Sequence, residues 1–151
     1  MVRFGRAQSF GVAVILVVAI AATGCGDDEK GVSKAQFVKR ADTVCKRHYS
    51  VISAAAAKVL AGGKLPSRRE FGKLAMGTIV PQYTAQIAEL GEVEAPEASK
   101  AEYAKWLKDS EAVRGQIAAD PSKVANPQVF ASVNGQADRL GLSRECHVGP
   151  G

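Results

Sequence analysis

The chain has 151 residues, of which 46 % are hydrophobic, 23 % charged and only 6 % aromatic, and its formal net charge is +5 at pH 7. This length gives room for one domain, and the composition is ordinary for a globular chain. Because Ala and Val supply most of the apolar residues, we expect a small, closely packed helical core without a roomy cofactor cavity.

The first 24 residues are typical of a targeting segment. Two arginines precede an apolar run of 13 residues at 10–22, which fits the core of a signal peptide and is shorter than the ~20 residues that span a bilayer. We therefore predict a lipoprotein signal peptide over 1–24, a tether over 25–32 and a helical domain over 33–151. The alternative is a short anchor helix that stays on the chain.

Cys25 directly follows the predicted signal peptide and marks its cleavage site. The residues "ATGC" that end at it look like a bacterial lipobox, in which the cysteine receives a diacylglycerol and becomes the first residue of the mature chain. Ala22 stands where Leu is commonest, so ordinary cleavage after Ala21 is the alternative. The count of three cysteines favours lipidation, because it leaves Cys45 and Cys146 as one pair with no odd thiol.

Capping boxes predict where the first two helices begin. Ser33 and Gln36 have the spacing of a capping box, and Ser67 and Glu70 repeat it. The segment "AGGKLP" between them is a helix breaker. The two predicted helices lie near 33–61 and 67–91.

Prolines predict the starts of the next two helices, because the first turn of a helix tolerates proline. Pro96 opens one periodic segment, and Asn126 is a good N-cap before Pro127 in the other. Gly141 suits the left-handed position that ends a helix, with Leu142 folding back on the last turn. These two helices lie near 96–119 and 127–140.

Apolar residues recur at helical spacing in all four segments, and no strand-like alternation competes with them. The predicted core positions are Val38, Ala41, Cys45, Ile52, Ala55 and Val59 on the first helix, Met76, Ile79, Val80, Tyr83, Ile87 and Leu90 on the second, Tyr103, Trp106, Leu107, Ser110, Val113 and Ile117 on the third, and Phe130, Val133, Ala137 and Leu140 on the fourth. We therefore predict an all-α fold, a four-helix up-down bundle closed by one disulfide.

Pro81 interrupts the second predicted helix. It lacks the N–H of a backbone hydrogen bond, and in a straight helix its ring clashes with the carbonyl of Gly77. We predict a kink at 77–81 that wraps the helix round the bundle. A functional hinge is the alternative.

Cys45 and Cys146 are the predicted disulfide. It closes a loop of about 100 residues, which the chain-entropy model values at roughly 4–5 kcal/mol. With His48 and His147 these cysteines could instead form a Cys2His2 zinc site. Adjacent residues seldom ligate one metal, however, and export favours oxidation of the two thiols to a disulfide.

His48 and Tyr49 are candidate haem ligands, although few large residues surround them to form a pocket. We expect a half-buried structural histidine, and we predict neither metal nor cofactor.

Several motifs together resemble those of small secreted lipoproteins common in actinobacteria. They are the lipobox, "FVKRADTVC" on the first helix, "P-x5-I-x2-L" ending the second, a proline and then Trp106 on the third, and the closing "GLSREC". The resemblance covers most of the chain from Phe37 to Cys146. It implies a helical domain held outside the cytoplasmic membrane, and it implies nothing about catalysis, because the family has no established activity.

Positive charge is concentrated in the first half of the predicted domain. Residues 30–73 carry eleven Lys and Arg against two acids, a net charge of +9, whereas residues 74–151 have a net charge of −3. Contact of this basic half with anionic lipid headgroups or wall polymers is one interpretation, and a solvated basic face is the other. The candidate contact residues are Lys39, Arg40, Lys46, Arg47, Arg68 and Arg69. Nucleic acid is not expected as a partner, because interleaved exposed aromatics that would stack bases are missing.

The sequence contains none of the common catalytic motifs, such as G-x-S-x-G, a P-loop, H-E-x-x-H or a dinucleotide fingerprint. We therefore expect a non-catalytic binding or interaction module of the bacterial cell envelope. A lipid anchor would hold it at the outer face of the cytoplasmic membrane. The alternatives are a haem or metal carrier and an envelope enzyme with an unrecognised site. The sequence identifies neither a ligand nor a protein partner.

Overall fold

The computed structural model describes residues 31–61, 63 and 66–149, and all regular structure in these residues is helical. The predicted signal peptide, Cys25 and most of the predicted tether lie outside the described residues. The elements in chain order are α1 (Lys34–Leu60), α2 (Arg68–Leu74), the π-helical turn η1 (Ala75–Ile79), α3 (Val80–Gly91), α4 (Glu97–Ala119), the 3-10 turns η2 (Pro121–Ala125) and η3 (Pro127–Val129), α5 (Ala131–Leu140) and the 3-10 turn η4 (Arg144–Cys146).

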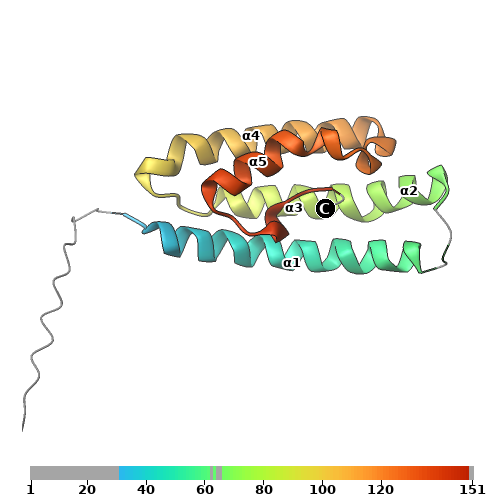
Figure 1. The fold of residues 1–151 in the computed structure, drawn as a ribbon, viewed down its shortest axis with the longest axis horizontal. Coiled ribbons are helices and arrows are strands. Elements are labelled where there is room, and N and C mark those ends of the chain that lie inside the picture. Colours follow the sequence, from blue (N-terminus) through green and yellow to red (C-terminus); the bar gives the residue numbers. More distant parts are fainter. Residues whose placement is uncertain (1–30, 62, 64–65, 150–151) are drawn as a thin grey trace, which may run out of the picture.

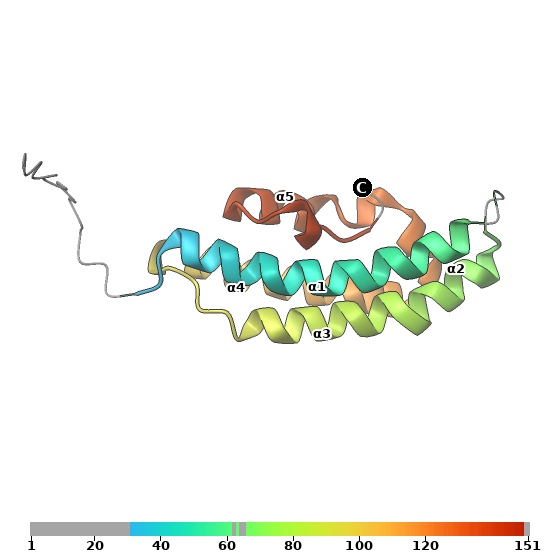
Figure 2. The same cartoon turned by 90° about the horizontal axis from the view of Figure 1, so that it is seen from below.

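The helices form the predicted four-helix up-down bundle, in which α2, η1 and α3 together make the second helix. Helix α1 packs on α3, α3 on α4 and α4 on α5. Successive helices run in opposite directions (Figure 1). After α5 the chain turns back, and η4 packs against α1, which is visible from below in Figure 2. The C-terminal segment thus closes the bundle onto its first helix.

The predicted helix caps are present. The Ser33 hydroxyl accepts a hydrogen bond from the Gln36 N–H, and the Gln36 side chain accepts one from the Ser33 N–H, both at 3.3 Å. Ser67 and Glu70 form the same reciprocal pair, at 3.3 and 2.7 Å. Gly141 ends α5 with a φ of 80°. These caps satisfy N–H groups and carbonyls that helix ends otherwise leave without partners.

A π-helical turn accommodates Pro81. The Val80 N–H donates to the Ala75 carbonyl five residues back, so the chain makes one wide turn just before the proline. Pro81 follows as the second residue of α3, so the position that lacks an N–H comes directly after the π turn, inside the continuous second helix. The interruption predicted at 77–81 takes this form, over Ala75–Ile79.

Buried residues confirm the predicted core, with one error. The buried members are Ala41, Cys45, Ile79, Tyr83, Leu90, Tyr103, Trp106, Ser110, Val113, Ile117, Phe130, Val133, Ala137 and Leu140. The half-buried members are Val38, Ile52, Ala55, Val59, Val80, Ile87 and Leu107. Met76 was predicted to face the core but is 46 % exposed. The π turn holds an extra residue, which rotates α2 relative to α3 and buries Leu74 and Ala75 in its place.

The fourth helix begins later than predicted. Helix α5 starts at Ala131, and residues 127–129 form the separate turn η3. The Asn126 side chain accepts a hydrogen bond from the Gln128 N–H at 3.0 Å, only two residues along the chain. Such a local bond favours a tight turn over the start of a continuous α-helix. Asp120 bonds Ser122 in the same way at 3.1 Å and opens η2, which the sequence pattern does not predict.

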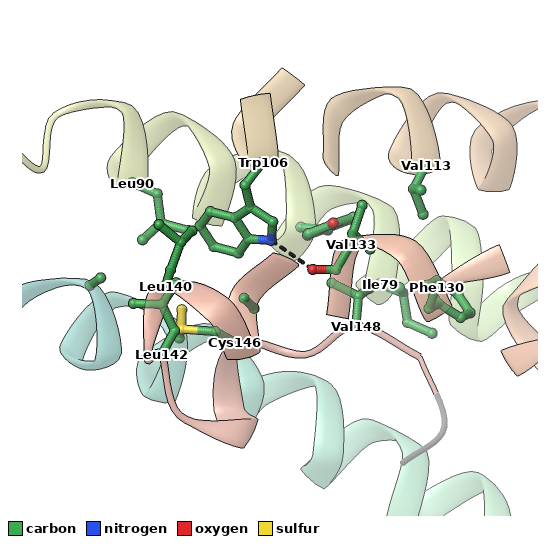
Figure 3. Packing of buried hydrophobic residues seen from close by; sticks show 14 of the residues in the cluster. Ile79, Leu90, Trp106, Val113, Phe130, Val133, Leu140, Leu142, Cys146 and Val148 are labelled. Atoms are coloured by element: carbon green, nitrogen blue, oxygen red, sulfur yellow. Dashed lines mark hydrogen bonds between the residues drawn. A yellow bond between two sulfur atoms is a disulfide. The ribbon is translucent and has the colours of Figure 1, made fainter. Parts of the chain in front are cut away.

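Aromatic side chains meet at the centre of the bundle. The rings of Phe37 and Tyr103 pack edge to face with centroids 4.9 Å apart, and Tyr103 stacks with Trp106 at 5.7 Å. Figure 3 shows the Trp106 indole N–H donating to the Val133 carbonyl of α5, at 3.0 Å. The core extends from Phe37 to Val148, so residues 30–151 contain every core contact that the structure describes.

Candidate functional site

The predicted disulfide joins Cys45 of α1 to Cys146 of η4. The two residues are 101 positions apart in the sequence, their Cα atoms are 4.8 Å apart, and both are buried. Figure 3 shows Cys146 beside Leu142 in the core. Because each sulfur is bonded to the other, neither is a free thiolate that could ligate a metal.

His48 is buried against α3. Its Nδ1 lies 2.9 Å from Oε1 of Gln82, and its Nε2 lies 3.2 Å from Oε1 of Glu89, at ion-pair distance but without hydrogen-bond geometry. Arg47 pairs with the same Glu89 carboxylate. His48 is 6 % exposed, so it is buried and not half-buried as expected. Tyr49 lies on another side of α1 and lines a groove, so this histidine and tyrosine do not face a common haem site.

His147 has a different partner. Its Nε2 lies 2.8 Å from Oδ1 of Asp138. The described residues hold no group of three or more His, Cys, Asp or Glu placed to bind a metal ion. Cys45 and Cys146 are bonded to each other. They and the two histidines, His48 and His147, therefore do not form the alternative zinc site.

The outer face of α1 is positively charged. Its exposed basic residues include Lys39, Arg40, Lys46 and Arg47. Asp42 is the single acid in this helix, and its carboxylate turns toward the C-terminal segment, where it accepts a hydrogen bond from the Ser143 N–H at 2.9 Å. Four of the six predicted contact residues therefore share one solvent-facing helix surface.

Arg68 and Arg69 lie apart from that surface. They begin α2, beside the C-terminal end of α1 (Figure 1). Helix α1 has 27 residues and is therefore about 40 Å long, which separates this pair from Lys39. Hydrogen bonds from Ser122 lower the pKa of Asp120, and the charge of Arg68 contributes to the same shift. Arg68 thus lies near enough to Asp120 for its charge to be felt, and the structure divides the predicted contact residues into a group of four and a distant pair.

The structure also contains an apolar groove that the sequence analysis did not find. It encloses about 400 Å³ between the second half of α1, the α2–α3 helix and the C-terminal segment. Its apolar lining comes from Ile52, Ala56 and Leu60 of α1, Phe71, Leu74, Ile79 and the ring of Tyr83 of the second helix, Val124 and Ala125 of η2, and Val148 of the C-terminal segment. Leu60 is 54 % exposed, so the groove opens to solvent.

Polar residues gather at one end of this groove. They are Tyr49, Gln86, Glu145 and His147. Gln86 donates to the Cys45 sulfur at 3.6 Å, which places this end beside the disulfide. Hydrogen bonds from its own backbone N–H and from Ser143 lower the pKa of Glu145, so its carboxylate is ionised at neutral pH. The opposite end, at Leu60 and Phe71, lies about 16 Å further along α1 and is apolar.

A sequence signal for the groove does exist. Tyr49, Ile52, Ala56 and Leu60 follow one another at steps of three and four residues. Ile52 belongs to the core stripe, and the other three lie beside it and widen the apolar arc of α1 beyond what one packing partner covers. Such a pattern indicates additional apolar surface, but it does not show which distant segments complete the groove.

No helix in residues 31–61 and 66–149 is both long enough and apolar enough to cross a bilayer. Comparisons of the chain with protein-family models, curated proteins and solved structures find no match. Its function must therefore be inferred from its own residues and geometry.

Proposed function

We propose that the protein is a lipid-anchored, non-catalytic binding module at the outer face of the bacterial cytoplasmic membrane. The observation that carries this proposal is the disulfide between Cys45 and Cys146. Structural disulfides persist in oxidising compartments outside the cytoplasm. The bond also accounts for two of the three cysteines, which leaves Cys25 for the lipid. Anchoring at Cys25 agrees with the signal-like segment before it and with the resemblance to secreted actinobacterial lipoproteins.

The tether keeps the domain near the membrane. Seven residue steps separate Cys25 from Val32, which reach about 25 Å at full extension. Two acyl chains suffice for stable anchoring, so the basic face is not needed to hold the protein down. Its role in this proposal is orientation: Lys39, Arg40 and Lys46 turn α1 toward anionic headgroups or wall polymers. This attraction acts over about 8 Å at physiological salt.

Replacement of Cys25 tests the anchor. The Cys25→Ala variant should fail to incorporate radiolabelled palmitate, and it should either be released from membranes or remain an unprocessed precursor. The Lys30→Ala variant changes the tether without touching the lipobox and should remain labelled and membrane-bound. A mature Cys25→Ala protein that still sediments with membranes would overturn the lipid anchor.

Binding to surfaces tests the orientation. Residues 30–151, without lipid, should sediment with anionic vesicles or purified wall polymer but not with neutral vesicles, and the binding should fade as salt rises. Replacing the group Lys39, Arg40, Lys46 and Arg47 by Gln should weaken it. The matched control replaces the same number of cations in the acidic half, Lys100, Lys105, Lys108 and Lys123. Equal loss in both variants, or binding that salt does not change, would reduce the basic face of α1 to a solvated surface.

A further inference from the structure

We propose that the apolar groove binds the hydrocarbon chain of an uncharged single-chain amphiphile. The chain lies along α1 toward Leu60, and the head group lies at Glu145 and His147. This inference goes beyond the proposed function, because it depends neither on the lipid anchor nor on the basic face of α1.

The size and enclosure of the groove suit a small ligand. Its volume of about 400 Å³ falls within the ~300–1,000 Å³ of typical small-molecule sites. Segments far apart in the sequence surround it, namely α1, the α2–α3 helix, η2 and the residues after η4. The disulfide ties the last of these to α1, so one wall is fixed in place before a ligand arrives.

The distribution of polar atoms selects an amphiphile. The lining side chains of Leu60, Phe71 and Leu74 have no hydrogen-bonding groups. A sugar or a peptide there would bury polar groups without partners, which costs free energy, whereas a hydrocarbon chain gains from leaving water. The hydrogen-bonding side chains of the lining are Tyr49, Gln86, Glu145 and His147 at the disulfide end, about 16 Å away along α1, and Tyr83, whose hydroxyl is buried. A ligand with one polar end and one long apolar end matches this arrangement.

The charges at the polar end favour an uncharged head group. The Glu145 carboxylate is ionised: hydrogen bonds from its own backbone N–H and from Ser143 hold its pKa low, and the nearby charge of Lys46 contributes. His147 is already paired with Asp138. Hydroxyl groups can donate to Glu145, whereas a carboxylate head group would be repelled by it. The head group of a monoacylglycerol has this chemistry.

Binding of monoacylglycerols of increasing chain length tests the proposal. Residues 30–151 are titrated with each lipid below its micelle concentration, without membranes. Each added methylene should tighten Kd by about fourfold, until the groove is filled and Kd levels off. A fatty acid of the same chain length should bind more weakly. Binding that ignores chain length would overturn the proposal, and tighter binding of the fatty acid would overturn the head-group assignment.

Two neighbouring alanines provide a matched pair of variants. Ala56 lines the groove, and Ala57 is exposed outside it. The Ala56→Trp variant should fill the groove and abolish binding, whereas Ala57→Trp should bind like the parent. Circular dichroism and a cooperative melt show that each variant is folded. Should Ala56→Trp fail to fold, Leu60→Ser serves in its place, with Val51→Ser, an exposed apolar residue outside this groove, as its control.

A second measurement tests the orientation of the ligand in the groove. A nitroxide at the end of the chain should broaden the amide NMR signals of Leu60 and Phe71 more strongly than that of His147. The reverse pattern, or equal binding by Ala56→Trp and Ala57→Trp, would overturn the proposal. So would a dimer in sedimentation that Leu60→Ser dissociates and that excludes the amphiphile. Because no vesicle is present, failure here is distinguishable from failure of the membrane or wall contact.

Discussion

The side-chain amide of Asn134 forms two hydrogen bonds with the backbone of Val148. Its Nδ2 donates to the Val148 carbonyl at 3.1 Å, and its Oδ1 accepts from the Val148 N–H at 3.0 Å. Asn134 belongs to α5, whereas Val148 follows the disulfide near the end of the chain. These bonds and the disulfide hold the segment that forms one wall of the apolar groove.

The Asn134→Ala variant should therefore be destabilised. It leaves both backbone groups of buried Val148 without their partner, which costs about 1–3 kcal/mol. Urea unfolding measures this loss, and hydrogen exchange at the Val148 amide should become faster. The control is Gln116→Ala, which removes an exposed amide from α4 and should change stability by less than about 0.5 kcal/mol. Equal stability of the two variants would show that the Asn134 bonds contribute nothing.

Reduction of the disulfide should lower the melting temperature markedly. The bond closes a loop across 101 residues, for which the chain-entropy model gives roughly 4–5 kcal/mol, a large part of the stability of a small domain. Calorimetry of residues 30–151 with and without reductant measures the change, and a Cys45→Ala, Cys146→Ala variant should melt like the reduced protein. Two thiols that titrate in the unreduced native protein would contradict the disulfide.

Two buried tyrosines should respond differently to loss of their hydroxyl groups. The Tyr103 hydroxyl donates to the Leu90 carbonyl at 2.6 Å, so Tyr103→Phe should cost about 1 kcal/mol. The Tyr83 hydroxyl is buried beside that of Ser110 but without hydrogen-bond geometry, and burial raises its pKa so that it stays protonated. Tyr83→Phe should therefore be neutral or stabilising. Chemical unfolding of both variants checks this, and a larger loss at Tyr83 than at Tyr103 would contradict it.

The cap of α2 should depend on pH through Glu70. Hydrogen bonds from Ser67 hold the pKa of Glu70 below its ordinary value, and the charge of Lys73 contributes. Because the folded pKa is depressed, the stabilisation is present above the unfolded pKa and is lost as the pH falls through the folded one. NMR titration should find this lowered pKa, and Ser67→Ala should raise it toward the ordinary value.

Ser33→Ala is the control for this titration. It breaks the other capping box, whose partner Gln36 does not titrate, and it should leave the pKa of Glu70 unchanged. A Glu70 pKa that stays the same in Ser67→Ala would show that the hydroxyl does not hold the carboxylate in solution.

The sequence alone determined the helices and most of what they bury. Capping involves groups at most three residues apart, as in the pair Ser33 and Gln36, so the local sequence is sufficient to predict it. The stripe of Trp106, Val113 and Ile117 is buried because a helix must cover its apolar face against something. If Cys25 is assigned to the lipid, Cys45 and Cys146 are the one pair of cysteines that the sequence leaves.

Only the tertiary structure decided the features that depend on distant segments or on small changes of helical phase. Met76 is exposed because one π turn rotates α2 relative to α3, and the energy difference between a kink and a π turn at Pro81 depends on the surrounding packing. The groove required Leu60, Phe71 and Val148 to meet across more than 80 residues. Hydrophobic burial is not directional. An apolar arc on α1 therefore indicates that other segments pack against this helix, but it does not indicate which segments they are.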